Sequence, residues 1–178
     1  MKYVSVEELK DFLGVLTSSE DALLIAIAEA AEKFVESFTG RNFKPELKTY
    51  HYHTSQACPY NGKLVLFLDD DLLSLVAVRV NGVEVSGVKA LGSHAPYFAL
   101  EIPLSDVDAI IEVEGYFGFS AFVPEDIKLA ILRLTAHLYR MRDSQILEAA
   151  RLNELGVILV EKGIPHDVLA ILNNYRRL

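Results

Sequence analysis

The spacing of apolar residues changes twice along this chain, and these changes limit the folds it can adopt. Residues 1–43 and 121–178 repeat apolar side chains every three or four positions, as amphipathic helices do. Residues 44–120 instead alternate apolar and polar side chains or form short apolar runs, as antiparallel strands do. The sequence therefore predicts an α+β fold: a helical N-terminal pair and C-terminal helices around an inserted antiparallel β region, in a single domain spanning residues 1–178.

The N-terminal helices have recognisable ends. The segment Ser5-Val-Glu-Glu8 is a capping box, which begins a short first helix. Ser18 or Ser19 is expected to cap the second helix, and Gly40 is expected to end it in the left-handed conformation. The apolar stripe of the second helix comprises Leu24, Ile27, Ala31, Phe34, Val35 and Phe38.

One turn in the β region is predicted with its register. Asn81-Gly82 supplies the positive φ angles of a two-residue hairpin turn, which sets Val80 opposite Val83 and Val78 opposite Val85 on the core face. Arg79 then lies opposite Glu84 on the outer face, where the two are expected to form an ion pair.

An acidic triplet in the same region reads as a turn. Asp69-Asp-Asp71 follows the apolar run Lys63–Leu68 and precedes the strand expected at Val76–Val80. It lacks the alternating ligands, the glycine and the final glutamate of a calcium loop. We therefore expect a solvated turn between two strands.

Two histidines are the best candidates for a metal site. In the alternating segment Thr49–His53, Tyr50 and Tyr52 face one way while His51 and His53 face the other. Two imidazoles at this spacing can chelate zinc, copper or nickel, with His94 or the acidic triplet as a third ligand. Two histidines on the solvent side of an edge strand explain the pattern equally well, so a metal-binding module or metalloenzyme is kept as the alternative function.

The C-terminal third is expected to be mostly helical. Pro124 suits the start of a long helix, which carries Arg133 and Arg140 on one face. Further predictions are a helix from Ser144 to Leu155, a short strand or packed loop from Val157 to Val160, and a last helix from His166 to Asn174. The buried stripe expected on the long helix comprises Ile127, Ala130, Ile131, Leu134, Leu138 and Met141.

Composition narrows the function classes. The net charge of −8 argues against nonspecific binding of nucleic acid, because affinity for phosphates increases with the number of lysine and arginine side chains that contact them. No apolar run approaches the length of a membrane span, and the single cysteine, Cys58, allows no internal disulfide. No nucleophile motif or cofactor loop is present, so the sequence predicts neither an enzyme nor a cofactor. A hydrophobic fraction of 51% and a mean hydropathy of +0.24 indicate apolar surface that other copies of the chain would cover.

Three segments resemble the head–tail connector (adaptor, or head-completion) proteins of tailed bacteriophages. The first helical pair closes with "VESFTGRNF", which contains the family's Phe-Thr-Gly-Arg-x-Phe signature from Phe38 to Phe43. The helix "VPEDIKLAILRLTAHLYRMRD" begins at a Val-Pro-Glu-Asp cap and ends with Tyr139 and Arg140. The tail "GIPHDVLAILNNYRRL" contains Pro165 and ends with the Tyr-Arg pair Tyr175 and Arg176.

The resemblance implies a structural virion protein made in the host cytoplasm. Copies would form a closed ring of about a dozen subunits beneath the portal, through heterologous contacts. The ring would extend the DNA channel, through which the genome passes without specific binding, and would provide a platform for the downstream tail protein. Six residues are expected to contact a neighbouring subunit or the portal: Arg41, Arg133, Tyr139, Arg140, Tyr175 and Arg176.

Overall fold

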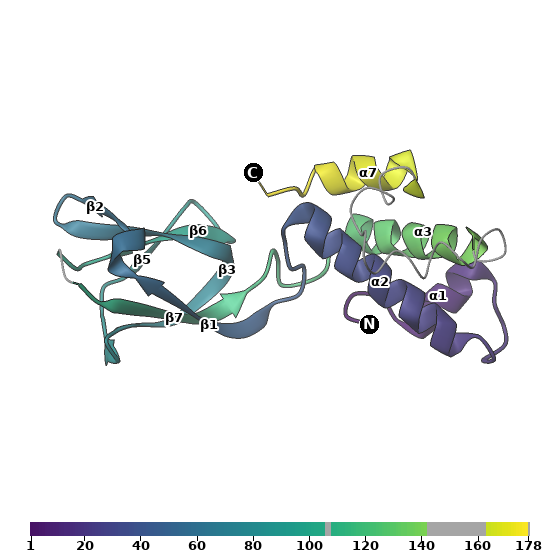
Figure 1. The fold of residues 1–178 in the computed structure, drawn as a ribbon, viewed down its shortest axis with the longest axis horizontal. Helices are drawn as coiled ribbons and strands as arrows, with labels where there is room; N and C mark the ends of the chain where they lie inside the picture. The colour runs from purple at the N-terminus through teal and green to yellow at the C-terminus, as the bar shows by residue number, and fades with distance from the viewer. Residues whose placement is uncertain (106–107, 142–162, 178) are drawn as a thin grey trace. The chain divides into compact units, whose positions relative to one another are not determined.

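The computed structural model describes residues 1–105, 108–141 and 163–177, and the chain forms two compact units (Figure 1). The helical unit joins residues 1–40 to residues 123–178, and the β unit comprises residues 41–122. The predicted α+β fold, with helices before and after an inserted antiparallel region in the sequence, is confirmed. The predictions for residues 144–155 and 157–160 lie outside the described residues.

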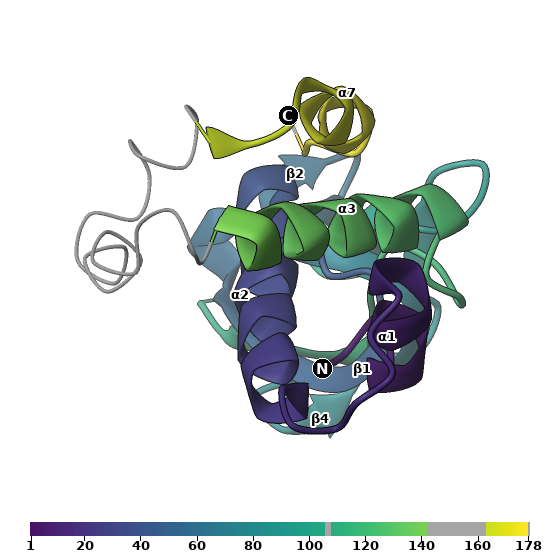
Figure 2. The ribbon, with the colours of Figure 1, turned by 90° about the vertical axis from the view of Figure 1, so that its right-hand side faces the viewer.

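Four described helices make up the helical unit: α1 (Val6–Leu13), α2 (Asp21–Thr39), α3 (Glu125–Met141) and α7 (His166–Asn173). Figure 2 shows α1 and α2 on one side of α3 and α7 on the other. None of the described helices is both long and apolar enough to cross a bilayer. The fully buried side chains of this unit include Leu9, Leu24, Val35, Ile127, Ile131, Val168 and Leu172.

The helix ends confirm most of the predicted caps. The Glu8 amide donates to Ser5 Oγ at 3.1 Å, and the Ser5 amide donates to Glu8 Oε2 at 2.7 Å. Gly40 follows α2 at φ 65°, in the left-handed region. The cap expected at Ser18 or Ser19 is wrong, because these residues form a turn in which the Asp21 amide donates to the Ser18 carbonyl. Glu20 precedes α2 instead and gives no side-chain cap.

The last residue of the predicted stripe on α3 is not buried. Ile127, Ala130, Ile131 and Leu134 are buried as expected. Met141, the last residue of α3, is 47% exposed. The apolar period therefore located the helix correctly but extended its buried face by one turn.

The β unit is a seven-stranded antiparallel sheet. Its main path runs β1-β7-β3-β6-β5, and the short strands β2 and β4 pair with β3. The strands are β1 (Glu46–His53), β2 (Cys58–Tyr60), β3 (Lys63–Val80), β4 (Val83–Glu84), β5 (Lys89–Leu91), β6 (Tyr97–Ile102) and β7 (Ile110–Phe117).

The sheet folds over one core through its long strand. Residues 64–67 of β3 pair with β6, whereas residues 72–80 pair with β7, and the register shifts between the two halves. Buried side chains from both halves, among them Leu66 and Val78, belong to the same hydrophobic cluster. Figure 1 shows β2 and β6 across from β1 and β7. The sheet thus forms two layers that enclose a shared core.

The acidic triplet lies inside β3, so the predicted turn is wrong. The strand continues through it because Asp69 is exposed to solvent, while the carboxylates of Asp70 and Asp71 each have a partner within the fold. Asp70 accepts hydrogen bonds from Lys48 Nζ at 3.0 Å and from the Tyr50 hydroxyl at 3.1 Å. Asp71, which is 4% exposed, accepts one from Arg41 at 2.5 Å. The triplet marks the register shift rather than a chain reversal.

The Asn81-Gly82 hairpin is confirmed, but its outer ion pair is not. Both turn residues have positive φ, and Val80 pairs with Val83 as predicted. Val83 is 71% exposed, because β4 ends after two residues and does not reach the core. The Arg79 guanidinium pairs at 2.8 Å with Glu114 on β7 instead of Glu84, although Glu84 is its direct neighbour on β4.

Candidate functional site

The predicted contact residues on α3 have partners within the helical unit. Arg133 Nη1 pairs with Asp167 at the start of α7, and the Tyr139 hydroxyl donates to Glu20 just before α2. These contacts tie the polar side of α3 to the two neighbouring helices. Arg140 is exposed. A role of these residues in oligomer or portal contact stays a prediction.

The C-terminal tail is fixed to the same helices. The Tyr175 hydroxyl is 2.8 Å from both carboxylate oxygens of Asp126. Desolvation, together with the hydrogen bond and charge of Asp126, raises the pKa of Tyr175 to about 12. The Arg176 guanidinium lies 5.7 Å from the centre of the Phe38 ring, and the Arg177 amide donates to the Thr39 carbonyl at 2.8 Å. The contacts of the tail motif therefore stabilise the fold of its own subunit.

The residues of the signature from Phe38 to Phe43 also make contacts within their own subunit. Arg41 pairs with Asp71 and lies 5.1 Å from the centre of the Phe119 ring. Phe43 is fully buried and packs edge-on against Phe119, with ring centres 5.8 Å apart. This geometry explains why an arginine and a phenylalanine follow the end of α2, without assigning them to a subunit contact.

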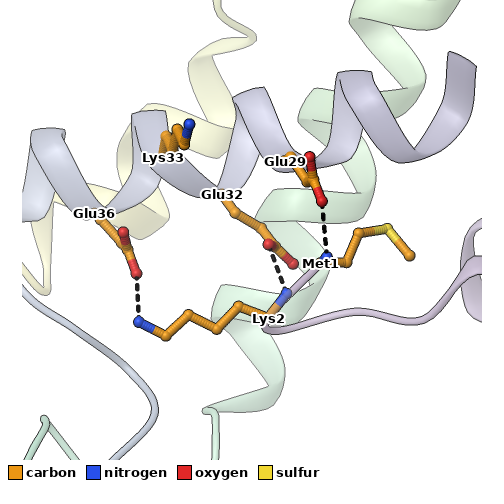
Figure 3. A pocket seen from close by; sticks show the side chains of 6 residues that line it. All are labelled: Met1, Lys2, Glu29, Glu32, Lys33 and Glu36. Carbon is orange, nitrogen blue, oxygen red and sulfur yellow. Dashed lines mark hydrogen bonds and ion pairs between the residues drawn. The ribbon is translucent and has the colours of Figure 1, made fainter. Parts of the chain in front are cut away.

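A shallow depression of about 390 Å³ lies where the N-terminal segment crosses α2 (Figure 3). Three glutamates of α2 hold that segment, and each is on the same side of the helix. Glu29 pairs with the Met1 amino group at 3.1 Å, and Glu36 pairs with Lys2 Nζ at 3.2 Å. Glu32 is 5% exposed, and its carboxylate accepts hydrogen bonds from the backbone amides of residues 2–4. The depression is therefore lined by groups that serve the fold.

The two histidines of β1 do not form a metal site with other described residues. Both are exposed, as the alternation predicted, but no group of three or more His, Cys, Asp or Glu side chains able to hold a metal occurs in the described part of the chain. His53 Nδ1 lies 2.8 Å from Ser55 Oγ, and its Nε2 lies 3.0 Å from Asp108. Asp108 is 91% exposed, so the contacts of His53 with Ser55 and Asp108 are open to solvent. A catalytic arrangement would instead need a preorganised site from which water is excluded. Its evident use is to cap the 3₁₀ turn Thr54–Gln56.

The β unit has an acidic outer face, formed by β1, β7 and the second half of β3. Arg79 lies there among three carboxylates, and the hydrogen bond with Glu114 raises its pKa, as do the charges of Glu84 and Glu112. Exposed apolar side chains border these charges: Leu47 on β1 is opposite Tyr116 on β7. We define the acidic face as Leu47, Arg79, Glu84, Glu112, Glu114 and Tyr116.

The other layer of the sheet has an outer face on which two lysines lie next to one glutamate. Lys63 on β3 pairs with Glu101 on β6 at 2.6 Å, and Lys89 on β5 is directly opposite Glu101. The hydrogen bond from Lys63 lowers the pKa of Glu101, and the charges of both lysines act in the same direction. We define the lysine face as Cys58, Tyr60, Lys63, Phe67, Lys89 and Glu101, of which Tyr60 and Phe67 are large exposed aromatic residues.

These two faces were missed in the sequence because they depend on how β3 pairs. The alternation of Thr49–His53 predicted an outward row on β1, but the run Lys63–Leu68 is apolar at nearly every position and reads as a central strand with no outward row. Only the continuous β3 places the two faces on opposite layers of one sheet.

Known proteins resemble this chain in sequence and fold. The profile of the family described as head completion protein matches residues 2–178. A chain in the solved neck of an empty GTA particle, computed with C6 symmetry, has a TM-score of 0.66 and 21% identity, covering 98% of this chain and 90% of that one. No curated protein matches the chain.

Two further solved structures have similar chains. A chain in the virion of a native gene transfer agent (GTA) particle has a TM-score of 0.62 and 19% identity, with 98% of this chain and 90% of that chain covered. A chain in the neck of a native GTA particle, computed with C12 symmetry, has a TM-score of 0.61 and 19% identity over 97% and 88% of the two chains. At these identities the likeness establishes the fold, whereas the profile spans nearly every residue: this chain belongs to the head completion protein family.

Proposed function

We propose that this protein is a head–tail connector of a tailed virus or similar particle, acting as a ring beneath the portal. The observation that carries the proposal is the family match over residues 2–178. The folds of chains from particle necks computed with sixfold and twelvefold symmetry support a ring, because a chain repeated around a channel must contact its neighbours on two sides. The role is structural and requires no catalysis.

The surface of the subunit suits such assembly. Thirteen large apolar side chains are exposed among the described residues, and they occur in both units. Burying apolar area contributes about 25 cal/mol per Å², so neighbours that cover these side chains gain affinity from them. In this proposal the ring extends the DNA channel and presents a platform to the downstream tail protein. The net charge of −8 favours passage of DNA without retention.

The test is a binding measurement with the portal protein of the same virus. Purified chain is mixed with portal at micromolar concentration and measured by native mass spectrometry. The proposal predicts a complex that carries many copies of the chain on one portal ring, and negative-stain images should place them on its tail-side face. Absence of binding under these conditions contradicts the proposal. A monomeric state of the isolated chain does not, because the portal can template the ring.

A further inference from the structure

We propose that neighbouring subunits of the ring join through their β units, with the acidic face of one copy against the lysine face of the next. This inference rests on the proposed function, since it needs a ring. It concerns which surfaces of the subunit form the contact.

The two faces point in opposite directions. The β1–β7 layer and the β2–β3–β6–β5 layer enclose one core, so their outer faces point away from each other. A closed ring needs two different surfaces on each subunit, and each must be able to reach a different neighbour. Opposite faces of one rigid sheet meet this requirement without any change of fold.

The two faces also differ in charge. On the acidic face, three carboxylates surround the Arg79 guanidinium, which leaves a net charge of −2. On the lysine face, two ammonium groups flank Glu101, so this cluster has a net charge of +1, while the exposed Asp69 lies further along β3. Two acidic faces would bring like charges together, whereas an acidic face against the cluster around Glu101 brings opposite charges together. Charge therefore favours the heterologous contact over a symmetric contact between two acidic faces.

Both faces carry exposed apolar side chains. Leu47 and Tyr116 adjoin across β1 and β7, and both are about half exposed. On the opposite layer, Tyr60 and Phe67 are 61% and 56% exposed. Protein–protein interfaces are typically rich in aromatic side chains at their centre and have a polar rim, as these two faces do. The charged groups determine which face of a neighbouring copy binds, and the apolar side chains supply the buried contact area.

Cysteine cross-linking tests the contact directly, because the single native cysteine, Cys58, is exposed on the lysine face. The variant Thr49→Cys places a second thiol on the outer row of β1, opposite Glu114. In the portal-bound assembly, a short bismaleimide should then join copies into a ladder of covalent trimers and larger species. Two controls are matched to this variant. Thr49→Cys combined with Cys58→Ser has one thiol and cannot exceed a dimer, and Ser37→Cys with native Cys58 places the second thiol on the helical unit.

The outcomes separate this inference from the proposed function. A ladder with Thr49→Cys but not with Ser37→Cys supports the face-to-face contact. A portal-bound assembly of many copies that gives only monomers and dimers overturns the contact and leaves the connector function standing. A chain that does not bind portal overturns both.

Charge exchange gives an independent readout. Glu84→Lys and Lys89→Glu, each alone, should weaken association between copies about three- to tenfold, and the two together should recover most of the loss. Loss in the single variants with no recovery in the double variant contradicts complementary charge at this contact.

Discussion

The buried carboxylate of Glu32 is predicted to hold the N-terminal segment on the helical unit. Its two oxygens accept hydrogen bonds from the backbone amides of Lys2, Tyr3 and Val4, with N–O distances of 2.7, 2.8 and 3.3 Å. Tyr3 and Val4 are themselves buried, so the segment covers part of the core. Glu32→Gln keeps the shape but replaces one acceptor with a donor.

The expected cost follows from these three contacts. One backbone donor loses its acceptor, which costs about 1–3 kcal/mol in a buried setting. The remaining bonds lose their charge assistance and become about half as strong. We therefore expect Glu32→Gln to lower the free energy of unfolding by about 2–4 kcal/mol. The control Glu29→Gln removes an ion pair whose carboxylate is 51% exposed, and should cost at most about 1 kcal/mol.

The assay is urea unfolding followed by circular dichroism at 222 nm, because all described α-helices belong to the helical unit. Hydrogen exchange locates the effect: the amides of residues 2–4 should exchange about 30- to 1,000-fold faster in Glu32→Gln than in the wild type. Equal stability of Glu32→Gln and Glu29→Gln, with unchanged exchange at residues 2–4, would refute the reasoning.

Three other substitutions test the packing and pairing described above. In Gly115→Ala the new Cβ would lie 2.7 Å from a methyl group of Leu72, so thermal unfolding should show a loss of about 1–3 kcal/mol. Arg41→Met leaves the buried carboxylate of Asp71 unpaired and should cost about 3–5 kcal/mol in chemical unfolding, a loss that neutralising Asp71 as well should largely remove. Tyr175 has its pKa raised from 10.0 to about 12 in the folded chain, so its hydroxyl stabilises the fold fully below pH 10 and loses that effect as the pH rises through 12. Stability measured against pH should therefore fall more steeply above pH 10 in the wild type than in Tyr175→Phe.

Local signals in the sequence predicted the helices and the hairpin well. Capping at Ser5 and Glu8, the left-handed Gly40 and the Asn81-Gly82 turn each depend on a few adjacent residues. Such interactions are complete within one turn of chain, so the sequence contains the whole of their physical cause. The structure confirms all three.

The errors within the β unit came from interactions between distant residues, whereas those at Ser18 or Ser19 and at Met141 concern helix ends. Asp69–Asp71 looked like a turn because three adjacent carboxylates are costly to place in a strand. Their partners, Arg41, Lys48 and Tyr50, come from earlier segments that only the fold brings near. The same cause explains Arg79, whose partner Glu114 is 35 positions away. Long-range pairing also decides which residues share the acidic and lysine faces.

Imaging of the neck of the virus particle that contains this chain tests the account most directly. Averaged without imposed symmetry, the density should contain a closed ring of copies of this fold around the DNA channel, in contact with the portal. The β units of adjacent copies should touch through the acidic and lysine faces. A neck whose ring is built entirely from other chains, with this protein absent from the particle or present elsewhere in it, would contradict the account.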